Sequence, residues 1–199
     1  MKLLHLIPCT FIGAIALGGA FQATAEPAVV VSIADQKLAL VENGEPVAQF
    51  SISTSKFGVG DLPGSYATPL GLLEVASKIG ANAPLGTVFK SRMQTGEVLR
   101  PNARGRDPIV TRILWLRGLE KRNARAHDRA IYIHGTPVER LIGRPASYGC
   151  IRMRSRDVAH LFNAVNVGTR IAVVTGHLRD AITRASADAL HSEFGFASN

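Results

Sequence analysis

Two residues in the second half of the chain carry the side chains that acyl transfer requires. Cys150 follows the small-residue turn Ser147-Tyr148-Gly149, and His134 ends the β-rich run 130–134, sixteen positions earlier. A free thiol is largely protonated at neutral pH, so a cysteine nucleophile needs a nearby base or a positive field. The sequence therefore offers Cys150 as a candidate nucleophile and His134 as its candidate base.

The turn before Cys150 could also stabilise the anion that such a reaction forms. Gly149 lets the backbone approach a substrate carbonyl closely, and the amides of Tyr148, Gly149 and Cys150 could face the oxygen of a tetrahedral intermediate. The spacing alone fits two plainer interpretations equally well. His134 could be a hydrogen-bonded structural histidine, and Cys150 could be a buried, inert residue.

The N-terminal residues 1–25 predict a secretory signal peptide. Lys2 precedes an apolar run, and Ala23-Thr24-Ala25 forms an A-x-A cleavage site. A membrane anchor is the alternative, but Pro8 and several glycines interrupt the run, which falls short of the roughly 20 apolar residues that span a bilayer. Lipidation of Cys9 is less favoured still, because Pro8 precedes it. We therefore expect a periplasmic or cell-envelope protein.

Cleavage of that segment would leave Cys150 as the last cysteine of the chain, so no intramolecular disulfide could form. In an oxidising compartment, a lone cysteine indicates either a reactive thiol or an intermolecular bridge. The histidines show no spacing that is typical of a metal site. We therefore expect no metal site.

The chain is basic, with 23 Lys and Arg against 15 Asp and Glu. An exported protein rarely meets nucleic acid, so anionic wall polymers or carboxylate-bearing peptides are better candidate partners. Most of the excess charge lies in residues 100–129, which hold nine basic and three acidic residues. A simple solvated surface explains such a run as well. We interpret 118–129 as a basic loop of low order.

Hydrophobic patterning predicts a β-rich chain. The runs 29–33, 37–41 and 47–53 form a hairpin, because Asn43-Gly44 is a strong turn signal. Residues 56–69 are rich in glycine and proline, which predicts a loop. Further strands are predicted at 72–77, 88–93, 109–116, 130–134 and 170–175.

One helix is well marked, at 156–165. Ser155 is a suitable N-cap, Asp157 favours the first turn, and apolar residues recur at i, i+3, i+4 and i+7. Residues 176–199 predict an amphipathic helix or a loose tail. The strands and the single helix favour a mixed sheet or sandwich rather than a doubly wound α/β fold, in one domain over 26–175.

The segment around the two candidate residues resembles the signature of the YkuD-type L,D-transpeptidases. That signature is a His-Gly-Thr/Asn block, a spacer, and then Ser/Thr-His-Gly-Cys-x-Arg, and the chain has His134-Gly-Thr136 and Ser147-Tyr-Gly-Cys-Ile-Arg152. Thr54 and Thr68-Pro-Leu-Gly71 agree in order, so the resemblance covers roughly 29–175. It implies a mainly β, L,D-transpeptidase-like mixed β-sandwich with one main helix after the catalytic Cys loop.

The resemblance also implies a role for each matching position. The nucleophile falls on Cys150, the base on His134, and the backbone carbonyl that orients the imidazole on Gly135. Two roles are open to Arg152: a bidentate donor to a substrate carboxylate, or a residue that fixes the loop through backbone contacts. The implied oxyanion and substrate-binding positions are Tyr132, Ser147, Tyr148, Gly149 and Arg152.

One position departs from the family pattern, since Tyr148 stands where a second histidine usually lies. A neutral phenol cannot supply the positive charge that an imidazolium would place beside the thiolate. We therefore expect the choice of donor or acceptor to differ from that of members with the histidine.

The implied activity is peptidoglycan L,D-transpeptidation. Cys150 would attack the carbonyl after the L-centre of diaminopimelate in a tetrapeptide stem, release D-alanine and form a thioester that an amine resolves. The acceptor could be another stem, an envelope-protein lysine, or water in a carboxypeptidase. Because Tyr148 replaces the usual histidine, a linkage at an atypical position of the stem is a further alternative. The resemblance implies no cofactor, and carbapenem-type inhibitors would acylate the same thiol. The contrasting alternative is a catalytically degenerate peptidoglycan-binding domain.

Overall fold

The structure is a computed structural model that describes residues 28–184. The predicted signal peptide, 1–25, and the end of the predicted tail, 185–199, lie outside the described residues. The elements in chain order are β1 (Ala28–Ser32), β2 (Lys37–Glu42), β3 (Glu45–Ser53), β4 (Gly71–Ile79), β5 (Thr87–Lys90), β6 (Met93–Val98), β7 (Ile109–Gly118), η1 (Lys121–Asn123), β8 (Tyr132–Gly135), η2 (Glu139–Leu141), β9 (Ile151–Met153), α1 (Ser155–Ala164) and β10 (Arg170–Val174).

The first three strands form the predicted hairpin. β1 pairs antiparallel with β2, and β2 pairs antiparallel with β3. The turn between β2 and β3 is Asn43-Gly44, with φ angles of 51° and 80°. Positive φ at both central residues is the geometry of a type I′ turn, which asparagine and glycine adopt most readily. The local sequence is therefore sufficient to specify this turn.

The strands join into one mixed sheet that curls until two of its members meet. The order is β4-β10-β1-β2-β3-β9-β8-β7-β5-β6, and β4 also pairs with β7. In this sheet order, the eight strands that run from β4 through β10, β1, β2, β3, β9 and β8 to β7 thus close into a ring, and the β5–β6 hairpin extends from β7. Two neighbouring pairs are parallel, β1–β10 and β8–β9. The predicted mainly β architecture with one main helix is confirmed.

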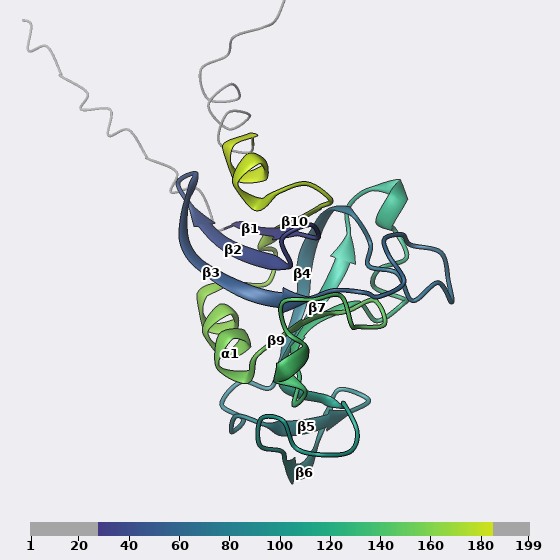
Figure 1. Ribbon diagram of the computed structural model, residues 1–199, viewed down its shortest axis with the longest axis vertical. Coiled ribbons are helices and arrows are strands. Elements are labelled where there is room, and N and C mark those ends of the chain that lie inside the picture. The colour runs from purple at the N-terminus through teal and green to yellow at the C-terminus, as the bar shows by residue number, and fades with distance from the viewer. Residues whose placement is uncertain (1–27, 185–199) are drawn as a thin grey trace, which may run out of the picture.

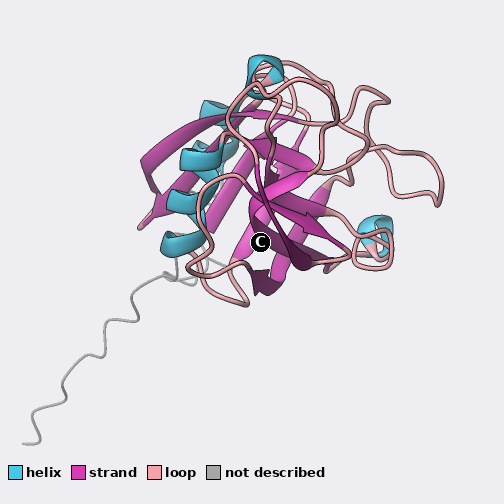
Figure 2. Cartoon of the chain, turned by 90° about the horizontal axis from the view of Figure 1, so that it is seen from below, coloured by secondary structure: helices cyan, strands magenta, loops and turns pink. Residues whose placement is uncertain are grey.

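Helical segments cover both faces of the β1–β2 hairpin. Figure 1 shows α1 on one side of these strands and the C-terminal helix, residues 178–184, on the other. Figure 2 shows the strands gathered with long loops on one side. Because side chains alternate along a strand, each face supplies its own apolar cluster. Beside α1 lie Val29, Val31, Leu38 and Leu40 with Val158, Leu161, Phe162 and Val165; beside the C-terminal helix lie Val30, Ala39 and Val41 with Leu178, Ala181 and Ile182.

The single strand predicted at 88–93 is wrong. β5 ends at Lys90, and the chain turns at Ser91-Arg92 before β6 returns antiparallel to β5. Both turn residues have positive φ, 50° and 68°, although neither is the glycine, asparagine or aspartate that usually marks such a turn. The apolar pattern continues through this turn, so it predicts one strand where the structure has two.

The predicted N-cap of the helix is also wrong. α1 begins at Ser155 itself, whose backbone N–H donates to Glu139 Oε1 at 2.9 Å. The Ser155 hydroxyl instead accepts a hydrogen bond from Thr111 Oγ1 at 2.8 Å. A carboxylate from η2 therefore caps the first turn, which local sequence could not indicate because Glu139 lies sixteen residues earlier.

The basic segment 118–129, predicted to be of low order, is fixed by specific contacts. Asn123 is buried, and its side-chain amide donates to the carbonyls of Leu70 and Leu72 at 2.9 Å each. The backbone N–H of Arg125 donates to Asp61 at 2.7 Å. These partners lie more than fifty residues earlier in the sequence, so the composition of the segment did not reveal them.

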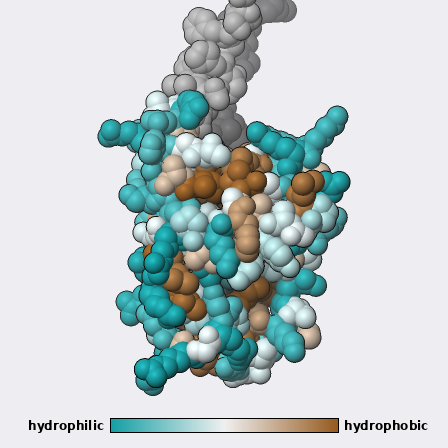
Figure 3. Space-filling view, turned by 45° about the vertical axis from the view of Figure 1, so that its right-hand side comes forward, coloured by the Kyte–Doolittle hydropathy of each residue, from teal (hydrophilic) through white to brown (hydrophobic). Residues whose placement is uncertain are grey.

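The predicted tail begins with a helix over 178–184. The Asp35 carboxylate accepts from the N–H of Leu178 at 2.7 Å and contacts His177 Nδ1 at 2.7 Å. These contacts lower the pKa of Asp35 and raise the pKa of His177. Within residues 28–184, no helix is long and apolar enough to cross a membrane. On the face drawn in Figure 3, hydrophobic residues gather in patches between hydrophilic ones.

Candidate active site

The parallel pairing of β8 with β9 brings the two candidate catalytic residues onto neighbouring strands. Ile133 pairs with Ile151 and His134 with Arg152, so Cys150, just before β9, lies opposite Tyr132. Ile133 and Ile151 are fully buried in the main core beside α1. Since side chains alternate, His134 and Cys150 share the opposite face, two positions apart along the strands.

A backbone carbonyl fixes the orientation of the His134 ring. His134 Nδ1 lies 2.8 Å from the carbonyl oxygen of Gly135, the contact that the resemblance implies. A carbonyl only accepts hydrogen bonds, so Nδ1 must carry the proton and Nε2 must present a lone pair. Burial lowers the pKa of His134 to about 4, against the opposing effect of the Gly135 contact. The imidazole is therefore a neutral base at pH 7.

The thiol of Cys150 is half-buried and protonated. Burial raises its pKa to about 11, although a hydrogen bond from the backbone of Tyr132 and the charges of Arg129 and Arg152 act in the opposite direction. Its Sγ lies 3.5 Å from the carbonyl oxygen of Ala130. A thiol in this state needs a base to become a nucleophile, and His134 is in the protonation state to act as one.

The turn before Cys150 is held by its own serine. The hydroxyl of Ser147 donates to the carbonyl of Cys150 at 2.6 Å and accepts from the amide of Gly149 at 3.2 Å. The Gly149 amide, one of the three predicted oxyanion donors, is thus engaged inside the turn. The amides of Tyr148 and Cys150 are the two that we retain as candidates.

A second loop, residues 54–68, holds this turn in place through hydrogen bonds. The backbone N–H of Ser147 donates to the carbonyl of Thr54 at 2.9 Å. The Thr68 hydroxyl donates to the carbonyl of Gly149 at 3.0 Å and accepts from the N–H of Ser55 at 3.0 Å. Both threonines belong to the positions on which the family resemblance was based. Their contacts show that they fix the cysteine loop.

Glycine is required at position 149 for two reasons. Its φ of 116° lies in the region that residues with a side chain rarely adopt. A Cβ added there would lie 3.3 Å from the carbonyl oxygen of Ala67 and 3.2 Å from Ile131 Cδ1. The backbone of the cysteine loop therefore packs directly on the backbone of the 54–68 loop.

Arg152 is buried and engaged by side chains. Its guanidinium pairs with Asp107 and donates to Ser53 Oγ at 3.2 Å. Asp107 also accepts from the hydroxyl of Thr136 at 2.5 Å, so it joins β8 to β9. Of the two roles open to Arg152, these contacts favour fixing the loop, through side chains rather than backbone. Arg152 is 5% exposed, and its contact with a substrate carboxylate stays a prediction.

Asp107 is a site residue that the sequence analysis missed. Besides pairing with Arg152, its charge raises the pKa of His134, against the larger effect of burial. The available signal was its isolation, as it is one of three acidic residues in the basic segment 100–129. Nothing in that pattern named Arg152 as its partner.

A buried ion pair, also missed, anchors the 54–68 loop to the segment before β8. Arg129 pairs with Asp61 at 2.8 Å, and both side chains are at least nine-tenths buried. Arg129 also donates to the carbonyls of Gly60 at 3.0 Å and Ala67 at 2.7 Å. Its positive charge acts to lower the pKa of Cys150. Arg129 thus both anchors the 54–68 loop and favours the thiolate form of Cys150.

Tyr132 and Tyr148, both predicted to contact substrate, lie in opposite environments. Tyr132 is 5% exposed, and its hydroxyl accepts a hydrogen bond from Arg92 at 3.3 Å. Its ring belongs to the apolar cluster against which Cys150 packs, and its backbone hydrogen-bonds the thiol. A contact of Tyr132 with substrate stays a prediction. Tyr148 is 61% exposed and accepts a hydrogen bond from Lys56 Nζ at 3.0 Å.

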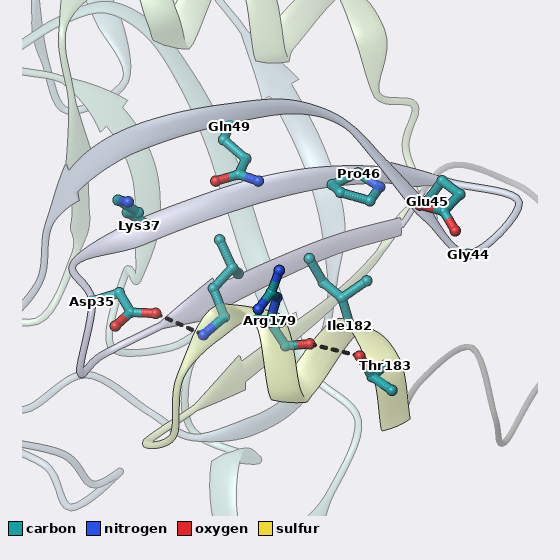
Figure 4. A pocket seen from close by; sticks show the side chains of 10 residues that line it. Asp35, Lys37, Gly44, Glu45, Pro46, Gln49, Arg179, Ile182 and Thr183 are labelled. Atoms are coloured by element: carbon teal, nitrogen blue, oxygen red, sulfur yellow. Dashed lines mark hydrogen bonds between the residues drawn. The ribbon is translucent and has the colours of Figure 1, made fainter.

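The described residues also form a cavity of about 790 Å³ away from Cys150. It lies between the β2–β3 hairpin and the C-terminal helix, as Figure 4 shows, and none of its lining residues is a predicted site residue. Within 28–184, no group of histidine, cysteine and acidic side chains is arranged to hold a metal ion.

Comparison with known proteins gives a family match over most of the chain. The model of the YkuD family, described as an L,D-transpeptidase catalytic domain, matches residues 26–173. A putative L,D-transpeptidase of Bacillus subtilis, YqjB, is 32% identical over 149 residues, which cover 74% of this chain and 71% of the relative. A probable L,D-transpeptidase of Escherichia coli K12, ErfK/SrfK, is 46% identical over 46 residues, or 23% of this chain and 15% of the relative.

Solved structures share the fold. An L,D-transpeptidase from Xylanimonas cellulosilytica superposes with a TM-score of 0.50 at 19% identity, and the match covers 77% of this chain and 62% of that one. The chain spans less than two thirds of the solved relatives that it matches first. At this level of identity the likeness establishes the architecture, and the chemistry must be argued from the site itself.

Proposed function

The chain belongs to the YkuD family of L,D-transpeptidase catalytic domains, and on that premise we propose that it is a peptidoglycan L,D-transpeptidase working through a thioester on Cys150. One observation carries the proposal. A protonated thiol and a neutral imidazole share one face of β8 and β9, and the Gly135 carbonyl leaves Nε2 of His134 as the basic atom.

The first half-reaction transfers one proton and exchanges one bond. The Cys150 thiol gives its proton to His134 Nε2, and the sulfur attacks the carbonyl carbon after the L-centre of diaminopimelate in a tetrapeptide stem. When the tetrahedral intermediate collapses, the carbon–nitrogen bond to D-alanine breaks, and His134 returns the proton to the leaving amine. A thioester remains on Cys150, and the amides of Tyr148 and Cys150 are the candidate donors to the oxyanion.

The second half-reaction consumes the thioester with an amine. His134 removes a proton from the incoming amine, a new amide forms, and the thiol is restored. Another stem would give a crosslink, and an envelope-protein lysine would give a protein attachment. The alternatives are water, which makes the protein an L,D-carboxypeptidase, and an atypical-linkage stem position, which Tyr148 makes a fair candidate.

We also propose export of the chain. Residues 1–25 have the composition of a cleaved signal peptide, and stem peptides are found outside the cytoplasmic membrane. A periplasmic or cell-envelope location agrees with an unpaired Cys150 kept as a functional thiol, and with a role in cell-wall synthesis and cell shape. Cell fractionation followed by N-terminal sequencing tests this: the protein should be recovered from the periplasm or envelope without residues 1–25, and recovery from the cytoplasm with Met1 intact would contradict export.

Acylation by a carbapenem tests the thiol mechanism. The purified protein is incubated with imipenem, and intact mass should rise by one bound drug molecule, located on the Cys150 peptide after digestion. The matched control is Cys150→Ala, which should show no increase. If the wild-type mass stays unchanged, or the increase persists in Cys150→Ala, the proposed thiol mechanism is wrong.

Muropeptide profiles then separate the acceptors. Overexpression should change the crosslinks of the cell wall if the acceptor is another stem, and mass spectrometry of the new dimers identifies the linked positions. A rise in tripeptide stems without new dimers would mean that water is the acceptor. A profile identical to that of cells expressing Cys150→Ala contradicts turnover of the stem.

A further inference from the structure

Three exposed aromatic side chains meet beside the cysteine loop. Phe57 and Tyr66 come from the 54–68 loop and Tyr148 from the turn before Cys150, and their exposed fractions are 50%, 55% and 61%. Their ring centroids lie 5.4 to 5.8 Å apart in all three pairs. We call this cluster the aromatic platform. Exposed apolar surface gathered in this way is typical of a binding site.

The backbone beneath the platform is fixed in a costly conformation. Tyr66 has a φ of 53°, an unusual value for a bulky residue, which costs on the order of 1 kcal/mol. The hydroxyl of Ser55 donates to the Tyr66 carbonyl at 2.5 Å, and Arg129 holds the next carbonyl, that of Ala67, at 2.7 Å. The ring of Tyr66 is therefore presented outward by an anchored backbone.

The platform is continuous with the candidate active site. Tyr148 is separated from Cys150 by Gly149 alone, and the carbonyl oxygen of Tyr66 lies 3.5 Å from where a Cβ of Gly149 would stand. The rings are tilted by 42° to 89° against one another, and a ligand in contact with them would be adjacent to a group reacting at the thiol. Nothing in the two half-reactions uses these rings, so their exposure calls for another explanation.

The charge of the platform restricts what it can bind. Aromatic faces carry negative electrostatic potential, so they attract polarised C–H groups and repel carboxylates. The ammonium of Lys56 lies 4.4 Å from the Tyr148 centroid and 5.1 Å from the Phe57 centroid, which places one positive charge against the cluster. The acidic stem peptide suits the ammonium but not the ring faces. A pyranose ring offers C–H groups to the faces and hydroxyls to the ammonium.

We propose that the aromatic platform binds a sugar ring of the glycan strand that carries the donor stem, with Lys56 donating to a sugar oxygen. The inference rests on the proposed function for the identity of the substrate. Its consequence is that the protein recognises the glycan as well as the peptide. A stem attached to sugar is then a better donor than the same stem free in solution.

Binding to peptide-free glycan strands tests the platform without requiring catalysis. Strands stripped of stems by an amidase are titrated against the full protein, and Phe57→Ala should bind them roughly three- to tenfold more weakly. Phe57→Trp should restore binding, because it keeps an aromatic face. The matched control is Met93→Ala, another exposed apolar residue, 70% exposed on β6, which should bind as the wild type does.

A kinetic ratio tests the same idea on the reacting enzyme. The kcat/KM for a disaccharide-linked tetrapeptide, divided by that for the free tetrapeptide, should fall roughly three- to tenfold in Phe57→Ala and stay constant in Met93→Ala. An equal loss for both substrates would mean that the platform binds peptide. Absence of glycan binding by the wild type would overturn the proposal even if carbapenem acylation succeeds. Glycan binding without acylation would overturn only the proposed chemistry.

Discussion

The two sides of the cysteine loop are built in opposite ways. Toward the interior, Arg152 with Asp107 and Arg129 with Asp61 form ion pairs whose arginines are nine-tenths buried or more. Toward solvent, Tyr148 and its aromatic neighbours are half exposed or more, with one lysine against them. The inner side fixes the positions of reacting atoms, so a change there costs structure or chemistry. The outer side touches solvent, so a change there alters what binds and leaves the fold intact.

The largest expected effect is the loss of the base on the inner side. In His134→Asn the side-chain amide nitrogen takes the place of Nδ1 and can still donate to the Gly135 carbonyl, but it cannot accept a proton near neutral pH. We expect the rate of carbapenem acylation to fall about 10²- to 10⁴-fold, the contribution of a positioned base. Stopped-flow or time-resolved mass spectrometry measures it. A rate within a factor of three of the wild type would show that another group deprotonates Cys150.

Breaking a buried ion pair should have a somewhat smaller effect, and this effect is on the free energy of unfolding. Arg129→Met leaves Asp61 as a buried carboxylate without its cation, which destabilises the fold by about 3 kcal/mol or more. The matched control is Arg117→Met, which breaks a pair whose arginine is 61% exposed, and we expect less than about 1 kcal/mol. Urea unfolding compares them. Equal losses would contradict the distinction between the two sides.

The buried imidazole should make stability depend on pH. The folded pKa of His134, about 4, lies below the ordinary value of 6.5, so the unfolded chain binds more protons between these values. The stabilisation is complete above pH 6.5 and is lost as the pH falls toward 4, with about 2 kcal/mol lost by pH 5. His134→Asn should lack this component. Urea unfolding of both proteins at pH 7 and pH 5 measures the difference, and parallel losses would count against a buried neutral histidine.

The smallest effect on the fold is expected at Tyr148. Because the side chain is exposed, Tyr148→His should change the free energy of unfolding by less than about 0.5 kcal/mol. It restores the residue usual in the family, so turnover should be kept or raised. Thermal unfolding and muropeptide turnover check the two parts. A loss of turnover in a stable protein would show that the tyrosine has a role of its own.

Features specified by neighbouring residues could be predicted from the sequence. The Asn43-Gly44 turn, the long β7 and the helix after Cys150 each follow from local patterning, and the structure contains them. The strand between Ser91-Arg92 and Val98 was missed because its turn uses residues that rarely adopt positive φ. Strands are therefore predictable from local sequence only where the turns between them use the residue types that usually form turns.

Features that depend on distant partners could not be predicted. His134 and Cys150 were found through their types and motif, but their parallel strand pairing is a property of the whole sheet. Asp107, Asp61 and Glu139 act on groups between 16 and 68 residues away in the chain. The position of a charged residue in the sequence does not indicate its partner, so these contacts could be identified only from the structure.

The short contact between β3 and β9 has a consequence for association with other chains. β9 pairs with only Ile52 and Ser53, so most of β3 presents an open edge to solvent. Pro46 lies on that edge next to a bulge in β3 itself, and prolines and bulges prevent a foreign strand from adding to a sheet. The outer strand β6 is interrupted by Gly96, whose φ is 84°. Both open edges are thus poor templates for amyloid-like growth.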